Sequence, residues 1–110
     1  DQDDVVAKVL MDMARTETVP RTDRLAEAMV RSIKAADIRM HRLPMQAGGF
    51  SVLKSPDIPS VLLELGFLSS ARDFSRLVNP AWRAKMAEAI RTALADWAQG
   101  EATLRDLVSP

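Results

Sequence analysis

The sequence contains no cysteine and only one histidine, His41. The lack of cysteine excludes disulfide bonds and thiolate metal sites, but it does not decide the cellular compartment. Catalytic zinc sites usually take two or three histidines, often with a glutamate, so a single histidine cannot supply one. His41 lies in a basic stretch of the chain, and we expect it to be a surface or packing residue.

The sequence also lacks net charge and any long hydrophobic run. Fifteen basic side chains balance fifteen acidic ones, so no strong field draws the chain toward nucleic acid or an acidic membrane surface. The basic cluster of Arg39, Arg42 and Lys54 has few aromatic neighbours, which argues against nucleic-acid binding. No apolar run approaches the roughly 20 residues that span a bilayer.

The 110 residues that are present suffice for one small folded domain. The first of them is Asp1 rather than methionine. We therefore expect the chain to be processed, or to be part of a longer protein from which a signal peptide could have been removed.

The first third of the chain predicts two helices. Apolar residues recur at helical spacing over residues 1–17, and acidic residues gather at the start, where the helix dipole favours them. Pro20 predicts a break, and a second helix follows from residue 22 or 23 to about residue 36. The apolar stripe of the first helix consists of Val5, Val6, Val9, Leu10 and Met13.

This stripe allows two interpretations. Its periodicity alone favours a helix that packs in the core of the domain. Its place near a terminus, before the break at Pro20, also fits a helix that docks into the groove of a partner. The residues by themselves leave both possibilities open.

The middle of the chain predicts two short strands, over residues 50–53 and 60–65. The second contains an apolar run that does not alternate with polar residues, which indicates an interior, parallel-type strand covered on both faces. Two short strands cannot form a stable sheet alone. The order of elements therefore predicts an α/β fold, of which this chain would be the second half.

The last part of the chain predicts two more helices. Ser70 begins a capping-box pattern for a short helix through residue 78. Asn79 and Pro80 predict the start of a long helix, which Gly100 would end. Two tryptophans lie on one face of this helix, and we expect both to anchor the core: Trp82 and Trp97.

Glu64 is a carboxylate within the apolar run of the second predicted strand. Burial of an unpaired carboxylate costs several kcal/mol, so the group must be neutral, paired or bound to a ligand. Ligand sites in open α/β sheets gather at the ends of such strands. Glu64 is thus either a structural ion-pair partner or a general acid and base, and the spacing alone does not separate these roles.

A long segment around Glu64 resembles a known family signature. Residues 52–70 read "VLKSPDIPSVLLELGFLSS", preceded by "HRLPMQAGGF" and followed by "FSRLVNPAWRAKMAEAI". These segments closely resemble the zinc-dependent N-acetylmuramoyl-L-alanine amidases, which cleave bacterial peptidoglycan. The opening "DDVVAKVLMDMARTET" is similar to the subgroup that acts in cell division.

The resemblance implies the C-terminal portion of a helix-flanked, mostly parallel or mixed six-stranded sheet. It implies hydrolysis of the amide between N-acetylmuramic acid and L-alanine, in the periplasm or outside the cell. In that family two histidines and a glutamate hold a zinc ion, and a further glutamate, which matches Glu64, assists catalysis. The zinc ligands lie upstream in the family and have no counterpart in this sequence. The chain alone is therefore expected to be inactive and to need the N-terminal half of the same domain.

The resemblance also implies a division of the chain and a mode of regulation. Residues 1–19 would be the interaction helix of an autoinhibitory insertion, residues 20–100 the catalytic part and residues 101–110 a tail. The stripe at residues 5–13 would bind an activator domain that resembles a degenerate metallopeptidase. In the alternative, the chain is a non-catalytic fragment that only presents this helix to the activator.

Overall fold

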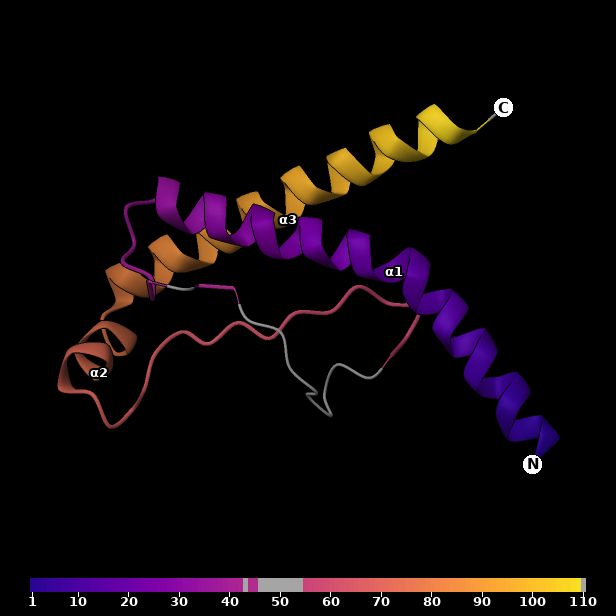
Figure 1. Ribbon diagram of the computed structural model, residues 1–110. Helices are drawn as coiled ribbons and strands as arrows, with labels where there is room; N and C mark the ends of the chain where they lie inside the picture. The colour runs from indigo at the N-terminus through magenta and orange to yellow at the C-terminus, as the bar shows by residue number, and fades with distance from the viewer. Residues whose placement is uncertain (43, 46–54, 110) are drawn as a thin grey trace.

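The computed structural model describes residues 1–42, 44–45 and 55–109 and contains three helices in these ranges. They are α1 (Gln2–Ala35), α2 (Ala71–Leu77) and α3 (Pro80–Val108). Helices α1 and α3 run antiparallel and cross along their length, and α2 lies near the start of α3 (Figure 1). An extended segment, residues 55–69, runs back along the helix pair (Figure 1).

The hydrophobic core lies between α1 and α3 and forms two adjoining clusters. The first consists of Leu25, Ala28, Met29 and Ala93, and the second of Ile33, Ile38, Met86 and Ala89. Trp97 packs against the first cluster and Trp82 against the second, so the expected role of both tryptophans is confirmed. The extended segment adds Val61 to the first cluster and Leu63 to the second.

The predicted break at Pro20 is wrong, because α1 continues through it. A proline inside a helix removes one backbone hydrogen bond and costs about 3 kcal/mol. A contact from α3 holds α1 beyond the proline, because the Trp97 indole N–H donates to the Arg21 carbonyl at 2.9 Å. The buried Thr18 hydroxyl donates to the Ala14 carbonyl at 2.9 Å, a bond within the helix that favours a bend. The axis of α1 bends between its N-terminal part and the part that packs on α3 (Figure 1), as an interior proline favours.

The predicted sheet is also wrong, because the described residues contain no strand. Residues 60–65 are extended, but they exchange no backbone hydrogen bond with another described residue. An extended segment becomes a strand only when a neighbour pairs with it. The other predicted strand, residues 50–53, lies outside the described residues.

The predicted starts of the last two helices are confirmed, whereas the start predicted at residue 22 or 23 and the end predicted at Gly100 are wrong. Ser70 caps α2, Asn79 caps α3, and Pro80 is the first residue of α3. Gly100, however, lies inside α3, which continues to Val108, so the expected tail is mostly helical. Glycine ends a helix by adopting a left-handed conformation, and no described glycine has a positive φ.

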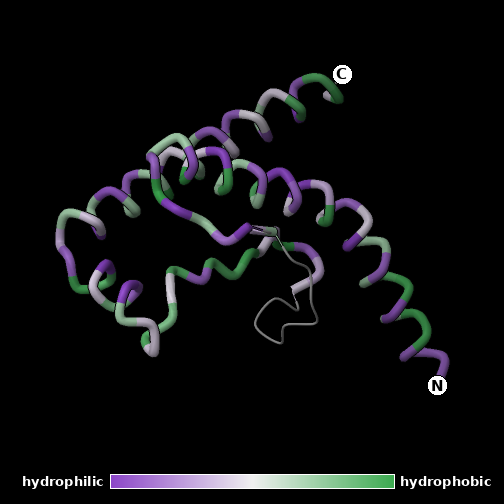
Figure 2. Tube along the Cα trace, turned by 60° about the vertical axis from the view of Figure 1, so that its left-hand side comes forward, coloured by the Kyte–Doolittle hydropathy of each residue, from purple (hydrophilic) through white to green (hydrophobic). Residues whose placement is uncertain are grey.

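The molecule is elongated and buries little apolar surface. Its radius of gyration is 17.2 Å, whereas a compact domain of this length has a radius of roughly 13 Å. Hydrophobic residues recur along the N-terminal part of α1 and along the extended segment (Figure 2), where many of them are exposed. None of the described helices combines the length and the hydrophobicity needed to cross a membrane.

Candidate functional site

Glu64 lies on the side of the extended segment that faces away from the helices. Successive side chains of an extended chain point to opposite sides. Val61 and Leu63 pack against the helix pair, which leaves Leu62 and Glu64 on the other side, where both are exposed. The expectation that this segment is covered on both faces, and that Glu64 is buried, is therefore wrong for this chain.

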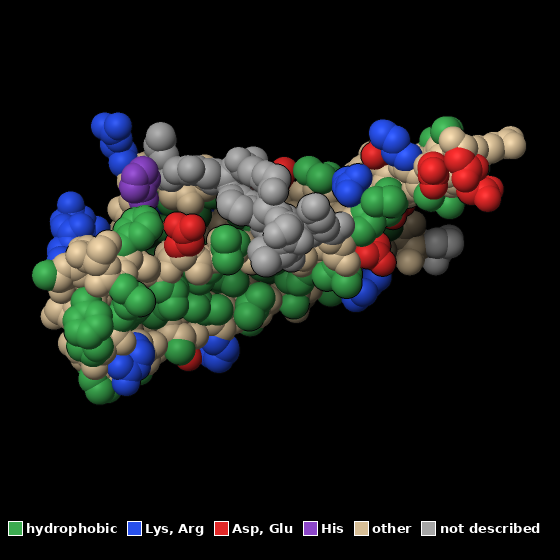
Figure 3. Space-filling view, turned by 90° about the horizontal axis from the view of Figure 1, so that it is seen from below, with side chains coloured by type: hydrophobic (Ala, Val, Ile, Leu, Met, Phe, Trp, Pro, Cys, Tyr) green, Lys and Arg blue, Asp and Glu red, His purple; other side chains and the backbone are tan. Residues whose placement is uncertain are grey.

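Large apolar side chains are also exposed on the extended segment that contains Glu64 and on the following helix α2. The space-filling view of this side shows hydrophobic side chains along the extended segment, with few charged ones among them (Figure 3). Each is between 43% and 75% exposed, and exposed apolar side chains that gather on one surface are typical of interaction sites. We call this set the outer apolar face, and it consists of Ile58, Leu62, Leu65, Phe67, Leu68, Phe74 and Val78.

A tight turn directly after Glu64 is held by Asp73 of α2. The Phe67 N–H donates to Asp73 Oδ2 at 3.0 Å, and the Ser70 N–H donates to the Phe67 carbonyl at 3.0 Å. The Ser70 hydroxyl accepts from the Asp73 N–H at 3.3 Å, which is one half of the predicted capping box. In the other half of a capping box, the Asp73 carboxylate would accept the backbone N–H of Ser70, but here it accepts the N–H of Phe67 instead. The sequence predicted the capping box that begins at Ser70, but not this contact between Asp73 and the turn.

The apolar stripe of α1 is exposed. Its five side chains are between 51% and 63% exposed, and every residue from 2 to 13 is exposed. The interpretation of the stripe as core-facing is therefore wrong for the described structure. The stripe begins beside acidic residues, since Asp1 caps the helix and Asp3 and Asp4 occupy its first turn.

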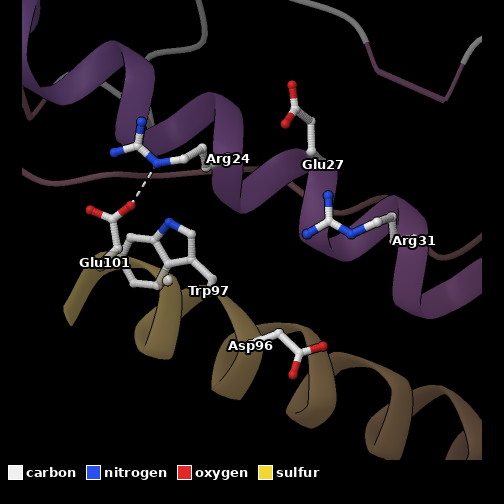
Figure 4. Close-up of a pocket in the computed structure, with 7 residues that line it drawn as sticks. Arg24, Glu27, Arg31, Asp96, Trp97 and Glu101 are labelled. Atoms are coloured by element: carbon white, nitrogen blue, oxygen red, sulfur yellow. Dashed lines mark hydrogen bonds and ion pairs between the residues drawn. The ribbon is translucent and has the colours of Figure 1, made fainter. Parts of the chain in front are cut away.

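A cleft of about 190 Å³ lies between α1 and α3. It is lined by Arg24, Glu27 and Arg31 of α1 and by Asp96, Trp97, Gly100 and Glu101 of α3 (Figure 4). The Arg24 Nε donates to Glu101 Oε1 at 2.8 Å, and the Arg21 Nε donates to Glu101 Oε2 at 2.9 Å. The bond from Arg24, followed by that from Arg21, holds the pKa of Glu101 below its ordinary value. This cluster joins the two long helices.

The described residues do not form a zinc site. They contain no group of three or more His, Asp or Glu side chains placed to hold a metal ion. His41 is exposed, as are Arg39 and Arg42, while Lys54 of the basic cluster lies outside the described residues. The described side chains therefore do not fit the two-histidine and glutamate set that the family resemblance implies.

Comparison with known proteins assigns most of the chain to one family model. A family model described as N-acetylmuramoyl-L-alanine amidase matches residues 6–96. The chain is 33% identical over 94 residues to N-acetylmuramoyl-L-alanine amidase AmiA of Salmonella typhimurium. These residues make up 86% of this chain and 32% of that protein. The chain is also 28% identical over 102 residues to N-acetylmuramoyl-L-alanine amidase AmiC of Escherichia coli. These residues make up 93% of this chain and 24% of that protein.

A third relative is similar over a shorter range. An uncharacterized cell wall amidase of Bacillus anthracis is 40% identical over 53 residues, which make up 48% of this chain and 10% of that protein. The chain spans 32% or less of the length of these three relatives. No solved structure matches the chain.

Proposed function

The chain belongs to the N-acetylmuramoyl-L-alanine amidase family, and on this premise we propose that it forms part of a peptidoglycan amidase. The complete enzyme hydrolyses the amide between N-acetylmuramic acid and L-alanine. The observation that carries this proposal is the exposed carboxylate of Glu64 within the outer apolar face. The match to relatives about three times as long supports a completed site that includes further residues.

The partner that covers the outer apolar face is, on this proposal, the N-terminal half of the same catalytic domain. Complete burial of a large apolar side chain stabilises a structure by about 1.5–3 kcal/mol. The seven side chains of the face are between 43% and 75% exposed, so about half of this stabilisation is still to be gained. Coverage would place Glu64 in a site that is largely closed to water.

Glu64 acts in this site as a general base and then as a general acid. It takes a proton from the attacking water and later gives it to the leaving amine of L-alanine. The zinc ion that the family resemblance implies would be held by ligands elsewhere in the protein, because the described residues do not form its site. The chain by itself is accordingly expected to be inactive.

Replacement of Glu64 tests this role. Glu64→Gln in the full-length protein should lower the release of stem peptides from peptidoglycan by about 10²–10⁴-fold, since the amide cannot take up the proton. The zinc content should not change. Asp57→Asn is a matched control, because it removes an exposed carboxylate from the same extended segment. Turnover by Glu64→Gln that equals that of the control would rule out the assignment.

The cellular role follows from the proposed substrate. Peptidoglycan lies outside the cytoplasmic membrane, so the enzyme would act in the periplasm or as a secreted protein, in cell-wall remodelling and daughter-cell separation. The names of the relatives, which include a cell wall amidase, support this setting.

A second proposed activity concerns the exposed stripe of α1. We propose that Val5, Val6, Val9, Leu10 and Met13 bind an activator domain that resembles a degenerate metallopeptidase, and that this contact relieves autoinhibition. Exposure of all five side chains on a helix that protrudes from the core favours a docking role. A non-catalytic interaction fragment would use the same contact. Loss of activity in Glu64→Gln would favour the enzyme over this alternative, because a fragment that only binds the activator does not need Glu64.

Charge insertion tests the docking surface. Val9→Asp with Leu10→Asp should weaken binding of the activator domain by at least about tenfold, because docking would bury two carboxylates. Ala7→Asp with Met11→Asp adds the same charge outside the stripe and should bind like the original chain. Equal affinities for the two double variants in a titration would show that the stripe is not the docking surface.

A further inference from the structure

We propose that Asp73 is a positioning residue that fixes the backbone at Glu64, an inference that rests on the proposed role of Glu64. The Asp73 carboxylate accepts the Phe67 N–H at 3.0 Å, three residues after Glu64. On the other side of Glu64, the adjacent Leu63 is packed into the helix core. The backbone on either side of Glu64 is thus held in place, by the packing of Leu63 on one side and by the hydrogen bond from Phe67 to Asp73 on the other.

The turn at Phe67, which the hydrogen bond to Asp73 holds, has little support from side-chain packing. Phe67 is 65% exposed and Leu68 is 75% exposed in the described structure. The turn therefore depends on its backbone contacts, namely the bond to Asp73 and the bond from the Ser70 N–H to the Phe67 carbonyl. Loss of the Asp73 acceptor would remove the contact that ties the turn to a side chain of α2.

The two oxygens of Asp73 have different surroundings. Oδ2 accepts from Phe67, whereas Oδ1 lies 4.0 Å from Arg72 Nε and 4.0 Å from Arg76 Nη1. The Asp73 side chain is only 18% exposed. A substitution that keeps an acceptor oxygen but removes the charge therefore separates the hydrogen bond from the ion pairs.

Gly66 allows the close approach of Asp73 to the turn. A Cβ atom at Gly66 would lie 3.1 Å from Asp73 Cβ and 3.4 Å from Asp73 Cγ, which is closer than ordinary carbon contacts. The absence of a side chain at this position thus lets the carboxylate reach the backbone beyond it.

Helix α2 is itself attached to the long helix α3. The Arg83 Nη1 donates to the Leu77 carbonyl at 3.0 Å, and the Asn79 N–H donates to the Arg76 carbonyl at 3.0 Å. A continuous series of contacts therefore runs from α3 through α2 and Asp73 to the backbone beside Glu64. Such support matters because a displacement of about 1 Å in a catalytic group can lower a rate about 10²-fold.

Three variants of the full-length protein test the proposal, with kcat, KM and Tm as readouts on peptidoglycan. Asp73→Ala should lower kcat about 10- to 100-fold with KM within about twofold. Asp73→Asn should keep kcat within about threefold, because its amide oxygen still accepts the Phe67 N–H. Glu101→Gln removes the carboxylate that binds Arg21 and Arg24 at the other end of the helix pair, and it should lower Tm without this loss of kcat.

Amide hydrogen exchange of Phe67 in the 110-residue chain provides a readout that does not depend on activity. The Phe67 N–H should exchange faster in Asp73→Ala than in Asp73→Asn. The proposal is overturned if Asp73→Asn loses as much kcat as Asp73→Ala, or if Glu101→Gln lowers kcat equally at a matched loss of Tm. Full activity of Glu64→Gln would sink the proposed function, whereas an inactive Glu64→Gln with a fully active Asp73→Ala would sink only the positioning role.

Discussion

Asp37 has a backbone φ of 59°, in the left-handed region that favours glycine. It follows α1, and its conformation lets the Ile38 N–H donate to the Ile33 carbonyl at 3.2 Å. Ile38 and Ile33 then pack together in the core. The turn therefore closes the helix with a buried contact, at the cost of a strained aspartate.

Replacement of this aspartate by glycine should stabilise the chain. Asp37→Gly removes the contact between Cβ and the backbone that disfavours the left-handed region, so the free energy of unfolding should rise by about 0.5–1 kcal/mol. Thermal unfolding of the 110-residue chain measures the change. Asp37→Ala keeps a Cβ and should not be stabilised. A glycine variant no more stable than the alanine variant would show that the conformation carries no strain.

Among the elements, the capped helix starts could be predicted from the sequence, whereas the continuation of α1 through Pro20 and of α3 through Gly100 could not. Caps such as Ser70 and Asn79 act within a few residues of their own position, so a local pattern suffices to find them. The effect of Pro20 and Gly100 depends on contacts from the other long helix. Trp97 reaches Arg21 from α3, and Arg21 and Arg24 reach Glu101 from α1, and no local pattern reveals such pairs.

The extended segment shows a similar limit for the candidate site. The family resemblance predicts a role for Glu64 that stays a prediction, whereas its hydrophobic neighbours predicted burial in a sheet that the described residues do not form. Burial of an apolar run depends on polypeptide that can cover it, and here Leu62 stays 50% exposed. The contact between Asp73 and Phe67 was not predictable, because it depends on how the turn folds onto α2.

At the scale of the whole molecule, an ionic cluster of Arg21, Arg24 and Glu101 joins the two long helices beyond the core. Glu101 accepts bonds from Arg21 and Arg24, and its side chain is 15% exposed, whereas those of the two arginines are 42% and 40% exposed. Solvent therefore screens the pairs in part, and we expect the cluster to stabilise the fold by about 1 kcal/mol. It lies next to Trp97, so its loss would loosen the same end of the helix pair.

This cluster predicts a loss of stability in acid. The bonds from Arg24 and Arg21 lower the pKa of Glu101 in the folded chain below its ordinary value of 4.5. A carboxylate with a lowered folded pKa contributes its full stability above the unfolded pKa and loses it as pH falls through the folded one. Glu101→Gln should therefore be less stable than the original chain at pH 7, by about 1 kcal/mol, and the difference should disappear in strong acid.

Urea unfolding of both chains at several pH values measures this difference in the free energy of unfolding. Carboxylates that both chains share, such as Asp12 and Glu88, contribute equally to the two chains and cancel in the comparison. A difference in stability that stays constant from pH 7 into strong acid would mean that the charge of Glu101 does not hold the helices together.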